Sequence, residues 1–444
     1  MRKVTSVLLV FLLTLAMLTG CASSPTTAVS TTTAKPATTT TVANATTAAT
    51  TPAATTVKKA TGKLVLWDGS FSTNYAVKAV DAFKTANPGV EVTVEYFPDA
   101  GMSDKYLTSM SSGSGPDIAA TNNDWIATLA QAGCLVDLKP LIDAEKYDMT
   151  DFFAGALEAV NYKTGIYGMP YRAETHGIFY NVDMFKEAGF TTMPETWEEV
   201  LPIIQAITKN GAGKYFGIGI PLGIVGNTTY QLFNMIRVAG GEVLSVDKRS
   251  AAFNSDKALK GINFFINLYL TGNTPKSAVE NDNNMNRELF ISKNIAMYMS
   301  GAYDIPTIQK GNATLNFATA KVPYFKGETR TTILAGWSMV INKASKNQDA
   351  GWAFAKFVST KDMSVTYSST FSARKSNITN AAYADKLYAP LADAVQYGKP
   401  LQLIPELSQI KQIIFDNLQP TWTAKKPVAD AVATAATAVN KLFT

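Results

Sequence analysis

The sequence is poor in the residues that most catalytic and metal-binding sites require. Its 444 residues include two cysteines, Cys21 and Cys134, and one histidine, His176. So few thiols and imidazoles exclude a disulfide scaffold and a Cys/His zinc cluster. Ser-His-Asp hydrolysis is disfavoured as well, because no Gly-x-Ser-x-Gly turn surrounds any serine. We therefore expect no metal ion and no cofactor.

Acidic residues are absent from the first 61 positions, which carry five basic residues. The whole chain has 40 Lys and Arg and 35 Asp and Glu, so the part beyond position 61 is electrically neutral. Nucleic-acid-binding domains usually concentrate basic charge in their folded part. We therefore expect no nucleic-acid partner. The hydrophobic content of 46% is that of a globular protein.

Residues 1–20 have the composition of a secretory signal peptide. Arg2 and Lys3 precede an apolar run that is shorter than the ~20 residues needed to span a bilayer. The run ends in Leu18-Thr19-Gly20-Cys21, which resembles the bacterial lipoprotein signal. This resemblance implies cleavage before Cys21 and a lipid anchor on it, which holds the protein on the extracytoplasmic face of the cell membrane. Cys134 is then a lone thiol, and its apolar neighbours favour a small buried residue.

Residues 21–61 form a low-complexity segment. Of the 40 positions from 22 to 61, 16 are Thr, 11 are Ala and none is aromatic. Such a composition cannot bury enough apolar surface to offset the entropy lost on ordering. We interpret the segment as a disordered tether between the lipid and the folded part.

The folded part begins with an alternation of strand and helix patterns. Residues 63–67 are an apolar run typical of a buried strand, and 76–83 place apolar residues at helical spacing. Asn87-Pro88-Gly89 is a turn signal, and apolar residues alternate again from Val90 to Tyr96. This order predicts an α/β fold with crossover helices. Further on, a capping box at Thr196 and Glu199 predicts a helix start, and residues 333–341 predict a strand.

Several short motifs follow one another along residues 63–360. They are FKTANPGV at 83–90, GPDI at 115–118, QAGCLVDL at 131–138, GMPY at 168–171, FYNVDMF at 179–185, PETWEE at 194–199, AMYMSG at 296–301, GWSM at 336–339 and WAFAKF at 352–357. In the order and spacing of these motifs, the chain is similar to the extracellular solute-binding proteins of bacterial ABC transporters, specifically those that bind sugars and oligosaccharides.

The resemblance implies two α/β lobes joined by a hinge, with the ligand in the cleft between them. Because such a chain crosses the hinge more than once, each lobe is discontinuous. We expect the N-terminal lobe to comprise 62–172 plus 316–362, and the C-terminal lobe 173–315 plus 363–444. The implied function is delivery of a sugar to ABC transporter permease subunits by a monomer that performs no chemistry.

Position by position, the resemblance also implies a set of ligand-binding residues. Sugars present apolar C–H faces that stack on aromatic rings, and hydroxyls that donate to carboxylates. The positions that match the family's pattern are Trp67, Asp68, Asp124, Glu174, Tyr230, Tyr303, Gly336, Trp337 and Arg374. Thr121 departs from the pattern, since some oligosaccharide binders have a stacking Trp there.

Alternatives remain for several of these residues. The three aromatic residues Trp67, Tyr303 and Trp337 fit a hydrophobic core as well as a cleft. Asp124 fits a helix cap, Arg374 fits a surface salt bridge, and His176 fits a structural role near the hinge. Two other functions also remain: a surface glycosidase that uses Asp124 and Glu174, and the same fold binding a polyamine or a peptide.

Overall fold

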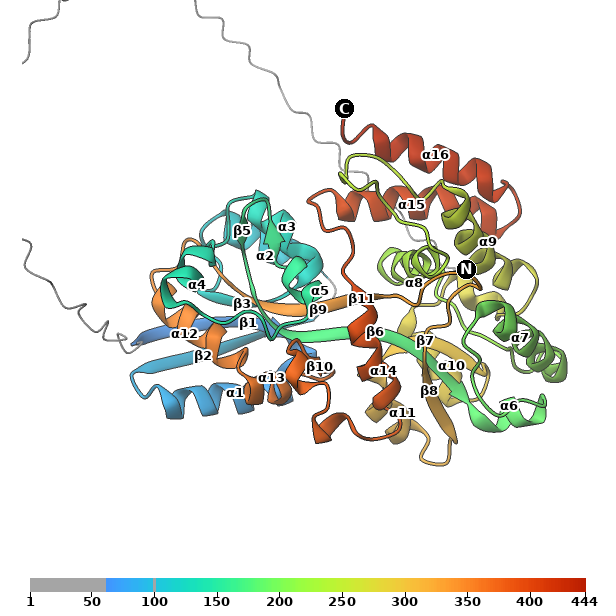
Figure 1. Ribbon diagram of the computed structural model, residues 1–444, viewed down its shortest axis with the longest axis horizontal. Coiled ribbons are helices and arrows are strands. Elements are labelled where there is room, and N and C mark those ends of the chain that lie inside the picture. Colours follow the sequence, from blue (N-terminus) through green and yellow to red (C-terminus); the bar gives the residue numbers. More distant parts are fainter. Residues whose placement is uncertain (1–60, 99–100) are drawn as a thin grey trace, which may run out of the picture. The chain divides into compact units, whose positions relative to one another are not determined.

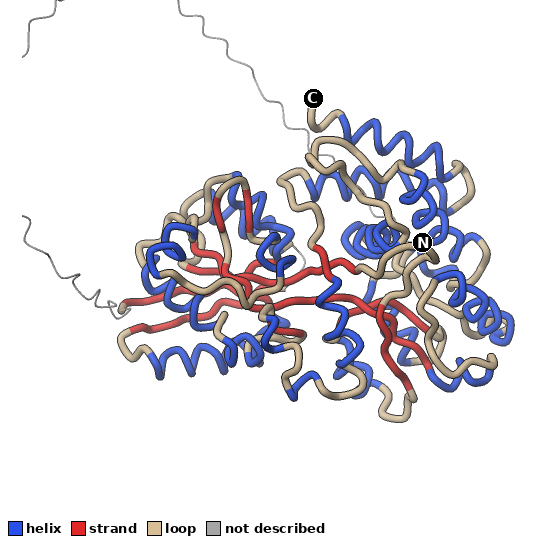
Figure 2. Tube along the Cα trace, in the orientation of Figure 1, coloured by secondary structure: helices blue, strands red, loops and turns tan. Residues whose placement is uncertain are grey.

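A computed structural model describes residues 61–98 and 101–444. Cys21, the signal peptide and almost all of the expected tether therefore lie outside the described residues. The described part is a mixed α/β structure with strands running through its middle and helices covering both sides, as Figures 1 and 2 show. No helix in these ranges is long and apolar enough to cross a membrane.

Strands and helices alternate from β1 to α3, as the patterns at the start of the folded part predict. The strands are β1 (Gly62–Gly69), β2 (Val90–Phe97), β3 (Ile118–Asn122), β4 (Asn161–Tyr162), β5 (Gly165–Ile166), β6 (Met169–Asn181), β7 (Met297–Gly301), β8 (Phe317–Lys321), β9 (Thr332–Ile341), β10 (Phe371–Ser372) and β11 (Gly398–Lys399). The first eight α-helices are α1 (Thr73–Ala86), α2 (Met102–Ser111), α3 (Asn123–Gln131), α4 (Lys139–Glu145), α5 (Ala154–Glu158), α6 (Val182–Glu187), α7 (Trp197–Gly211) and α8 (Val225–Val238). The others are α9 (Asp256–Leu270), α10 (Asn283–Ile291), α11 (Asp304–Gly311), α12 (Gln348–Val358), α13 (Lys361–Thr366), α14 (Ala389–Ala394), α15 (Leu407–Trp422) and α16 (Val428–Asn440).

The main sheet has the strand order β10-β6-β9-β3-β1-β2. Its first part, β2-β1-β3, is parallel and arises from the predicted strand–helix–strand unit at the start of the folded region. Strand β9 then enters antiparallel between β3 and β6. The short strand β11 pairs with the beginning of β9.

Strand β6 is the structural link between the two lobes. Its first half pairs with β9 and β10, and its second half pairs with β7 and β8. In Figure 1 the long green strand runs from one lobe into the other. Twelve of its thirteen residues are buried, and these include the polar residues Arg172 and His176.

Two clusters of buried apolar side chains stabilise the fold. The first gathers β1, β2 and β3 with α1, α12 and α13, and the second gathers helices α7, α8, α9, α15 and α16. Buried apolar residues between 367 and 395 belong to the first cluster. Those from Leu401 onward belong to the second. The lobe boundaries expected from the resemblance stay a prediction.

The local signals of helix starts are borne out with one difference. Thr196 is the N-cap of α7, but its hydroxyl donates to Oε2 of Glu199 at 2.7 Å and caps no backbone N–H. Ser255 caps α9 by accepting the N–H of Ala258.

Ile218 and Ile220 lie outside the named strands, although the apolar residues around them are typical of a strand. Nearby, Phe216 and Gly219 form isolated bridges to residues 295 and 298.

Candidate functional site

An ion pair lies on β6 where the strand passes between the lobes. Nη2 of Arg172 lies 2.5 Å from Oε2 of Glu174, and the two side chains are only 7% and 12% exposed. Arg172 also donates through Nε to Thr370 Oγ1 at 3.0 Å. In the sheet, Arg172 lies opposite Trp337 and Glu174 lies opposite Ala335 of β9. The ion pair thus fixes Glu174 in position. The remaining lone pairs of its carboxylate oxygens can still accept hydrogen bonds.

His176 and two of the expected aromatic residues adjoin Glu174. The rings of His176 and Tyr230 are 4.4 Å apart, and the Tyr303 hydroxyl lies 3.2 Å from Nε2 of His176. Burial lowers the pKa of His176 to about 4, so the imidazole is neutral at neutral pH. Burial, together with the Glu174 carboxylate, raises the pKa of both tyrosines. The structure therefore brings Glu174, Tyr230 and Tyr303 together, as the resemblance implies.

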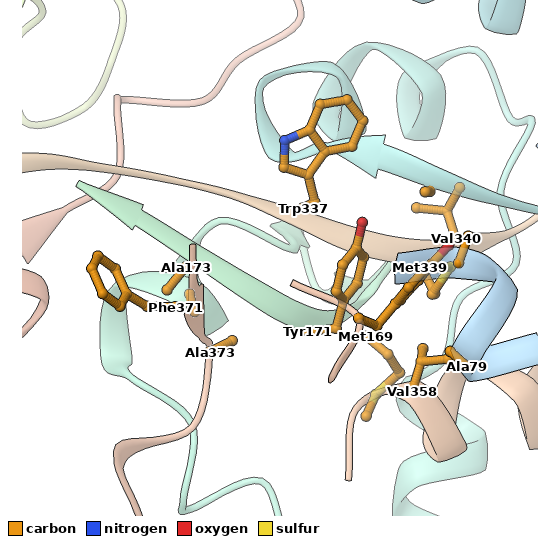
Figure 3. Close-up of a cluster of buried hydrophobic side chains, with 14 of the residues drawn as sticks. Ala79, Met169, Tyr171, Ala173, Trp337, Met339, Val340, Val358, Phe371 and Ala373 are labelled. Atoms are coloured by element: carbon orange, nitrogen blue, oxygen red, sulfur yellow. The ribbon is translucent and has the colours of Figure 1, made fainter. Parts of the chain in front are cut away.

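A row of aromatic rings continues from Arg172 into the N-terminal lobe. Trp337 lies 5.6 Å from Trp125 and 4.8 Å from Phe71, both edge to face. Trp337 itself is buried, with 5% of its surface exposed. In Figure 3 its ring projects to the other side of β9 from Tyr171 and Met169. The row therefore borders the Arg172–Glu174 pair.

Gly336 serves the packing of two strands. A Cβ at this position would lie 2.4 Å from the carbonyl oxygen of Arg172. Only glycine therefore lets β9 approach β6 this closely. The close neighbour of this buried residue is protein backbone, so a ligand contact at Gly336 has no support in the geometry.

Asp124 is held by a lysine from the far end of the chain. Nζ of Lys411, on α15, lies 2.7 Å from Oδ2 of Asp124, on α3. The Thr128 hydroxyl adds a 3.3 Å hydrogen bond to the carbonyl oxygen of Pro405 between the same two parts. The alternative of Asp124 as a helix cap is wrong, because the Asn122 side chain caps α3 by accepting the N–H of Asp124.

Trp67 and Asp68, at the end of β1, are both buried. Trp67 packs on Phe97 and Tyr106, with ring centroids 4.9 and 5.5 Å away. Asp68 is fully buried and accepts the Tyr367 hydroxyl at 2.5 Å and the Gly69 N–H at 2.7 Å. These contacts give Trp67 the core role that was left open, and they make Asp68 an anchor of the turn that follows it.

Arg374 makes structural contacts, among them the salt bridge that was its alternative role. It donates to the carbonyl oxygen of Ser359, to Asp151 and to the Tyr147 hydroxyl, at 2.6, 3.2 and 2.9 Å. Its guanidinium lies over the ring of Phe152. Each of its three side-chain nitrogens therefore already has a protein acceptor.

Cys134 is a small buried residue, as its apolar neighbours in the sequence indicate. Its Sγ lies 3.3 Å from the Ser111 hydroxyl.

Three residues of the candidate site were not predicted from the sequence: Phe71, Arg172 and Lys411. Arg172 could have been found, since it precedes Glu174 by two positions on a strand and so lies on the same face. Phe71 carries a weaker signal, as an apolar residue in a Gly/Ser-rich turn after a buried strand. Lys411 carries none, because 287 positions separate it from Asp124.

A cavity of about 640 Å³ lies elsewhere, away from these residues. It is lined by segments near Gly155, Gly240, Glu328 and Gly398, and none of the expected ligand-binding residues lines it. Arg237, a charged residue in its wall, already has protein partners, because it donates to the carbonyl oxygens of Lys399 and Pro400. We therefore place the candidate site at the Arg172–Glu174 pair and the aromatic rings beside it.

Comparison with known proteins decides the family. The model of the bacterial extracellular solute-binding protein family matches residues 69–364. The chain belongs to this family. The match covers β6, β9 and the residues from Phe71 to Trp337, and so includes most of the candidate site.

Two curated relatives bind sugars according to their names. The chain is 25% identical over 308 residues to a maltotriose-binding protein of Pyrococcus abyssi, a match that covers 68% of this chain and 63% of that protein. This solute-binding protein is also 25% identical over 387 residues to a galactooligosaccharide-binding protein of Bacillus subtilis, with 84% and 88% covered. The chain thus spans less than two thirds of the first relative's length and most of the second's.

Solved structures confirm the two-lobed fold. A solute-binding protein from Thermotoga lettingae, bound with alpha-D-tagatose, superposes with a TM-score of 0.77 and 24% identity over 86% of this chain and 100% of that one. The sugar-binding protein MalE from Xanthomonas citri gives a TM-score of 0.76 at 22% identity, with 86% and 97% covered. At these identities the likeness concerns the fold alone.

Proposed function

We propose that this solute-binding protein is a sugar receptor of an ABC importer. A sugar or oligosaccharide would bind where β6 passes between the lobes, and closure of the lobes around it would present the loaded protein to the permease. The observation that carries the proposal is the juxtaposition of the Arg172–Glu174 pair with aromatic rings on either side of it. The sugar-binding names of the relatives support the same ligand class.

The chemistry of a sugar fits this arrangement. Glu174 accepts hydrogen bonds from hydroxyls as a charged acceptor, and Arg172 donates to ring and hydroxyl oxygens. Tyr230 and Tyr303 offer hydroxyls and ring faces on one side, and the Trp337 row lies on the other. Asp124 is a second acceptor, shared with Lys411.

A glycosidase that uses Asp124 and Glu174 is less well supported. Glycoside hydrolysis needs two carboxyl groups that flank the scissile bond. Here each carboxylate is instead held by a cation of its own, Asp124 by Lys411 and Glu174 by Arg172. We therefore propose a protein that returns its ligand unchanged. Membership in a family of binding proteins agrees with this.

The test is a thermal-shift screen of the purified folded part against a panel of mono- and oligosaccharides, a polyamine and short peptides. A ligand present at 100 times its dissociation constant adds about 2.7 kcal/mol to the free energy of unfolding. The proposal expects such a stabilisation from at least one sugar. Stabilisation by the polyamine or a peptide alone would instead support a non-sugar solute.

A further inference from the structure

Phe71 is an exposed aromatic residue within the candidate site. Among the described residues, six large apolar side chains are strongly exposed, and Phe71 is the aromatic one, at 40% exposure. Its ring contacts Trp337 edge to face, with centroids 4.8 Å apart. Trp337 is 95% covered, partly by Phe71 itself. Phe71 is therefore the most exposed ring of this row, since Trp337 is buried and Trp125 is half-buried.

The turn that carries Phe71 is anchored at its first end, where it leaves β1. Phe71 is the middle residue of a single 3-10 turn, Ser70–Ser72, between β1 and α1. Directly before it, the carboxylate of Asp68 accepts the N–H of Gly69 and the hydroxyl of Tyr367, which fixes the end of β1. A ring on this turn is thus held in place before any ligand arrives, which reduces the entropy lost on binding.

Gly69 fixes the direction of the ring. A Cβ at Gly69 would lie 2.1 Å from Cε1 of Phe71, so the ring folds back over the glycine backbone. A larger residue at Gly69 would push the ring away from Trp337. The combination of Gly69, Trp337 and the exposed ring is a supported aromatic surface, unlike a side chain that moves freely in solvent.

The surroundings of the ring match the two kinds of surface on a sugar. The guanidinium of Arg172 lies 5.7 Å from the centre of the Phe71 ring, and Arg172 binds Glu174. An apolar face therefore adjoins a charged donor and a charged acceptor. A pyranose ring has apolar C–H groups on one face and hydroxyls around its edge, and this surface would bind both at once.

We propose that Phe71 is the ring on which a sugar residue of the ligand stacks, with Trp337 as its support. The inference rests on the proposed sugar-binding function and adds a binding residue to it. It also moves the stacking contact, expected at Trp337, to the residue that covers Trp337.

The experiment compares Phe71→Ala, Phe71→Leu and Phe71→Tyr with the wild-type protein by calorimetric titration. The probes are maltotriose, a galactooligosaccharide and D-tagatose, and the tightest-binding of them is used throughout. Val77→Ala is the matched control, since Val77 is a similarly exposed apolar residue on the neighbouring helix α1. Thermal melting of each ligand-free variant checks folding, and a half-exposed ring predicts a small change.

Phe71→Ala is expected to weaken binding by roughly 30-fold, the loss typical of an aromatic anchor. Phe71→Leu should lose close to 10-fold, because it keeps the apolar surface and loses the aromatic face. Phe71→Tyr and Val77→Ala should bind like the wild type. Wild-type affinity in both Phe71→Ala and Phe71→Leu would overturn the inference and leave the sugar-binding function standing. Failure of the wild-type protein to bind any sugar of the thermal-shift panel would overturn both.

Discussion

Lys411 of α15 and Asp124 of α3 form an ion pair between distant parts of the chain, with Nζ and Oδ2 2.7 Å apart. Their side chains are 15% and 22% exposed, so water screens the pair only in part. Helix α15 packs in the second cluster of buried side chains, whereas α3 contributes Ile126 and Leu129 to the first. The pair therefore links two separately packed regions next to the proposed ligand site.

Replacing either partner should destabilise the ligand-free protein by more than the loss of an exposed pair. We expect Lys411→Met and Asp124→Asn each to lower the free energy of unfolding, and the double variant to lose less than the sum. The coupling expected for a partly buried pair in contact is about 0.5–3 kcal/mol. Urea denaturation of the four proteins measures it, and strictly additive losses would show that the two residues do not interact in solution.

Glu174→Gln tests the central carboxylate of the proposed site. The substitution keeps the shape and one acceptor but removes the charge that strengthens hydrogen bonds from sugar hydroxyls. Hydrogen bonds to charged groups contribute about 1.5–3 kcal/mol, so affinity should fall by at least ~10-fold. Calorimetry with the preferred sugar gives the value.

Glu242→Gln is the matched control for Glu174→Gln. Glu242 is also the carboxylate partner of a buried arginine, Arg237, whose side chain is 4% exposed, but it lies outside the candidate site. The Glu242→Gln substitution should therefore leave sugar affinity unchanged. Equal losses in both variants would mean that the effect of Glu174→Gln is an indirect one through stability.

Asp68 should make the stability of the protein depend on pH. Burial raises its pKa from 3.8 to about 6, so the folded state holds the proton more tightly than the unfolded state. The contribution of Asp68 to stability is then complete below about pH 4 and is lost as the pH rises through about 6. The shift corresponds to about 3 kcal/mol.

Asp68→Asn isolates this effect, because the amide oxygen can still accept a hydrogen bond and the side chain no longer titrates. We expect the stability of the wild type relative to Asp68→Asn to decline between pH 4 and pH 7 in urea denaturation series. His176, whose pKa is lowered to about 4, acts in the opposite direction in both proteins and so cancels in the difference. A difference that stays constant over this range would contradict a buried ionisable Asp68.

Trp337→Ala should damage both folding and binding. The side chain is 5% exposed and contacts Phe71 and Trp125, so its removal should cost about 3–5 kcal/mol of stability in the ligand-free protein. Affinity should fall as well, since the Phe71 ring loses its support. Thermal melting and calorimetry measure the two effects, with Trp337→Phe as the conservative variant. A Trp337→Ala protein that melts like the wild type would place the indole outside the packed structure.

Cys21→Ser should release the protein from the membrane without changing sugar affinity. The basis is the Leu18-Thr19-Gly20-Cys21 signal, in which the thiol of Cys21 would receive the lipid. Membrane fractionation of cells grown with labelled fatty acid tests it, and Cys134→Ser serves as the control for the second thiol. Equal labelling of the wild type and Cys21→Ser would contradict the anchor.

The sequence predicted the fold more completely than it predicted the site. Local patterns alone indicate β1, α1 and β2, because β1 is a short apolar run buried in the sheet and α1 and β2 each bury one regular face. Glu174, Tyr230 and Tyr303 were found through short motifs, and the structure brings them together. The roles of Trp67 and Arg374 stayed open for a physical reason: a Trp at the end of a strand and an Arg in a loop can face inward or toward a cleft. The structure adds what the sequence does not show, the packing of Trp67 on Tyr106 and the hydrogen bond from Arg374 to Asp151. Contacts between distant segments, such as that of Lys411, leave no local pattern.

The most direct test of the account is calorimetric titration of the folded part with the sugar selected by the screen, followed by chromatography of the recovered sugar. The account predicts saturable binding of one sugar per protein chain, at least ~10-fold weaker in Glu174→Gln, and recovery of the sugar intact. Binding that Glu174→Gln leaves unchanged would contradict the proposed site. Release of shorter sugars or new reducing ends would contradict the proposed function and indicate an enzyme.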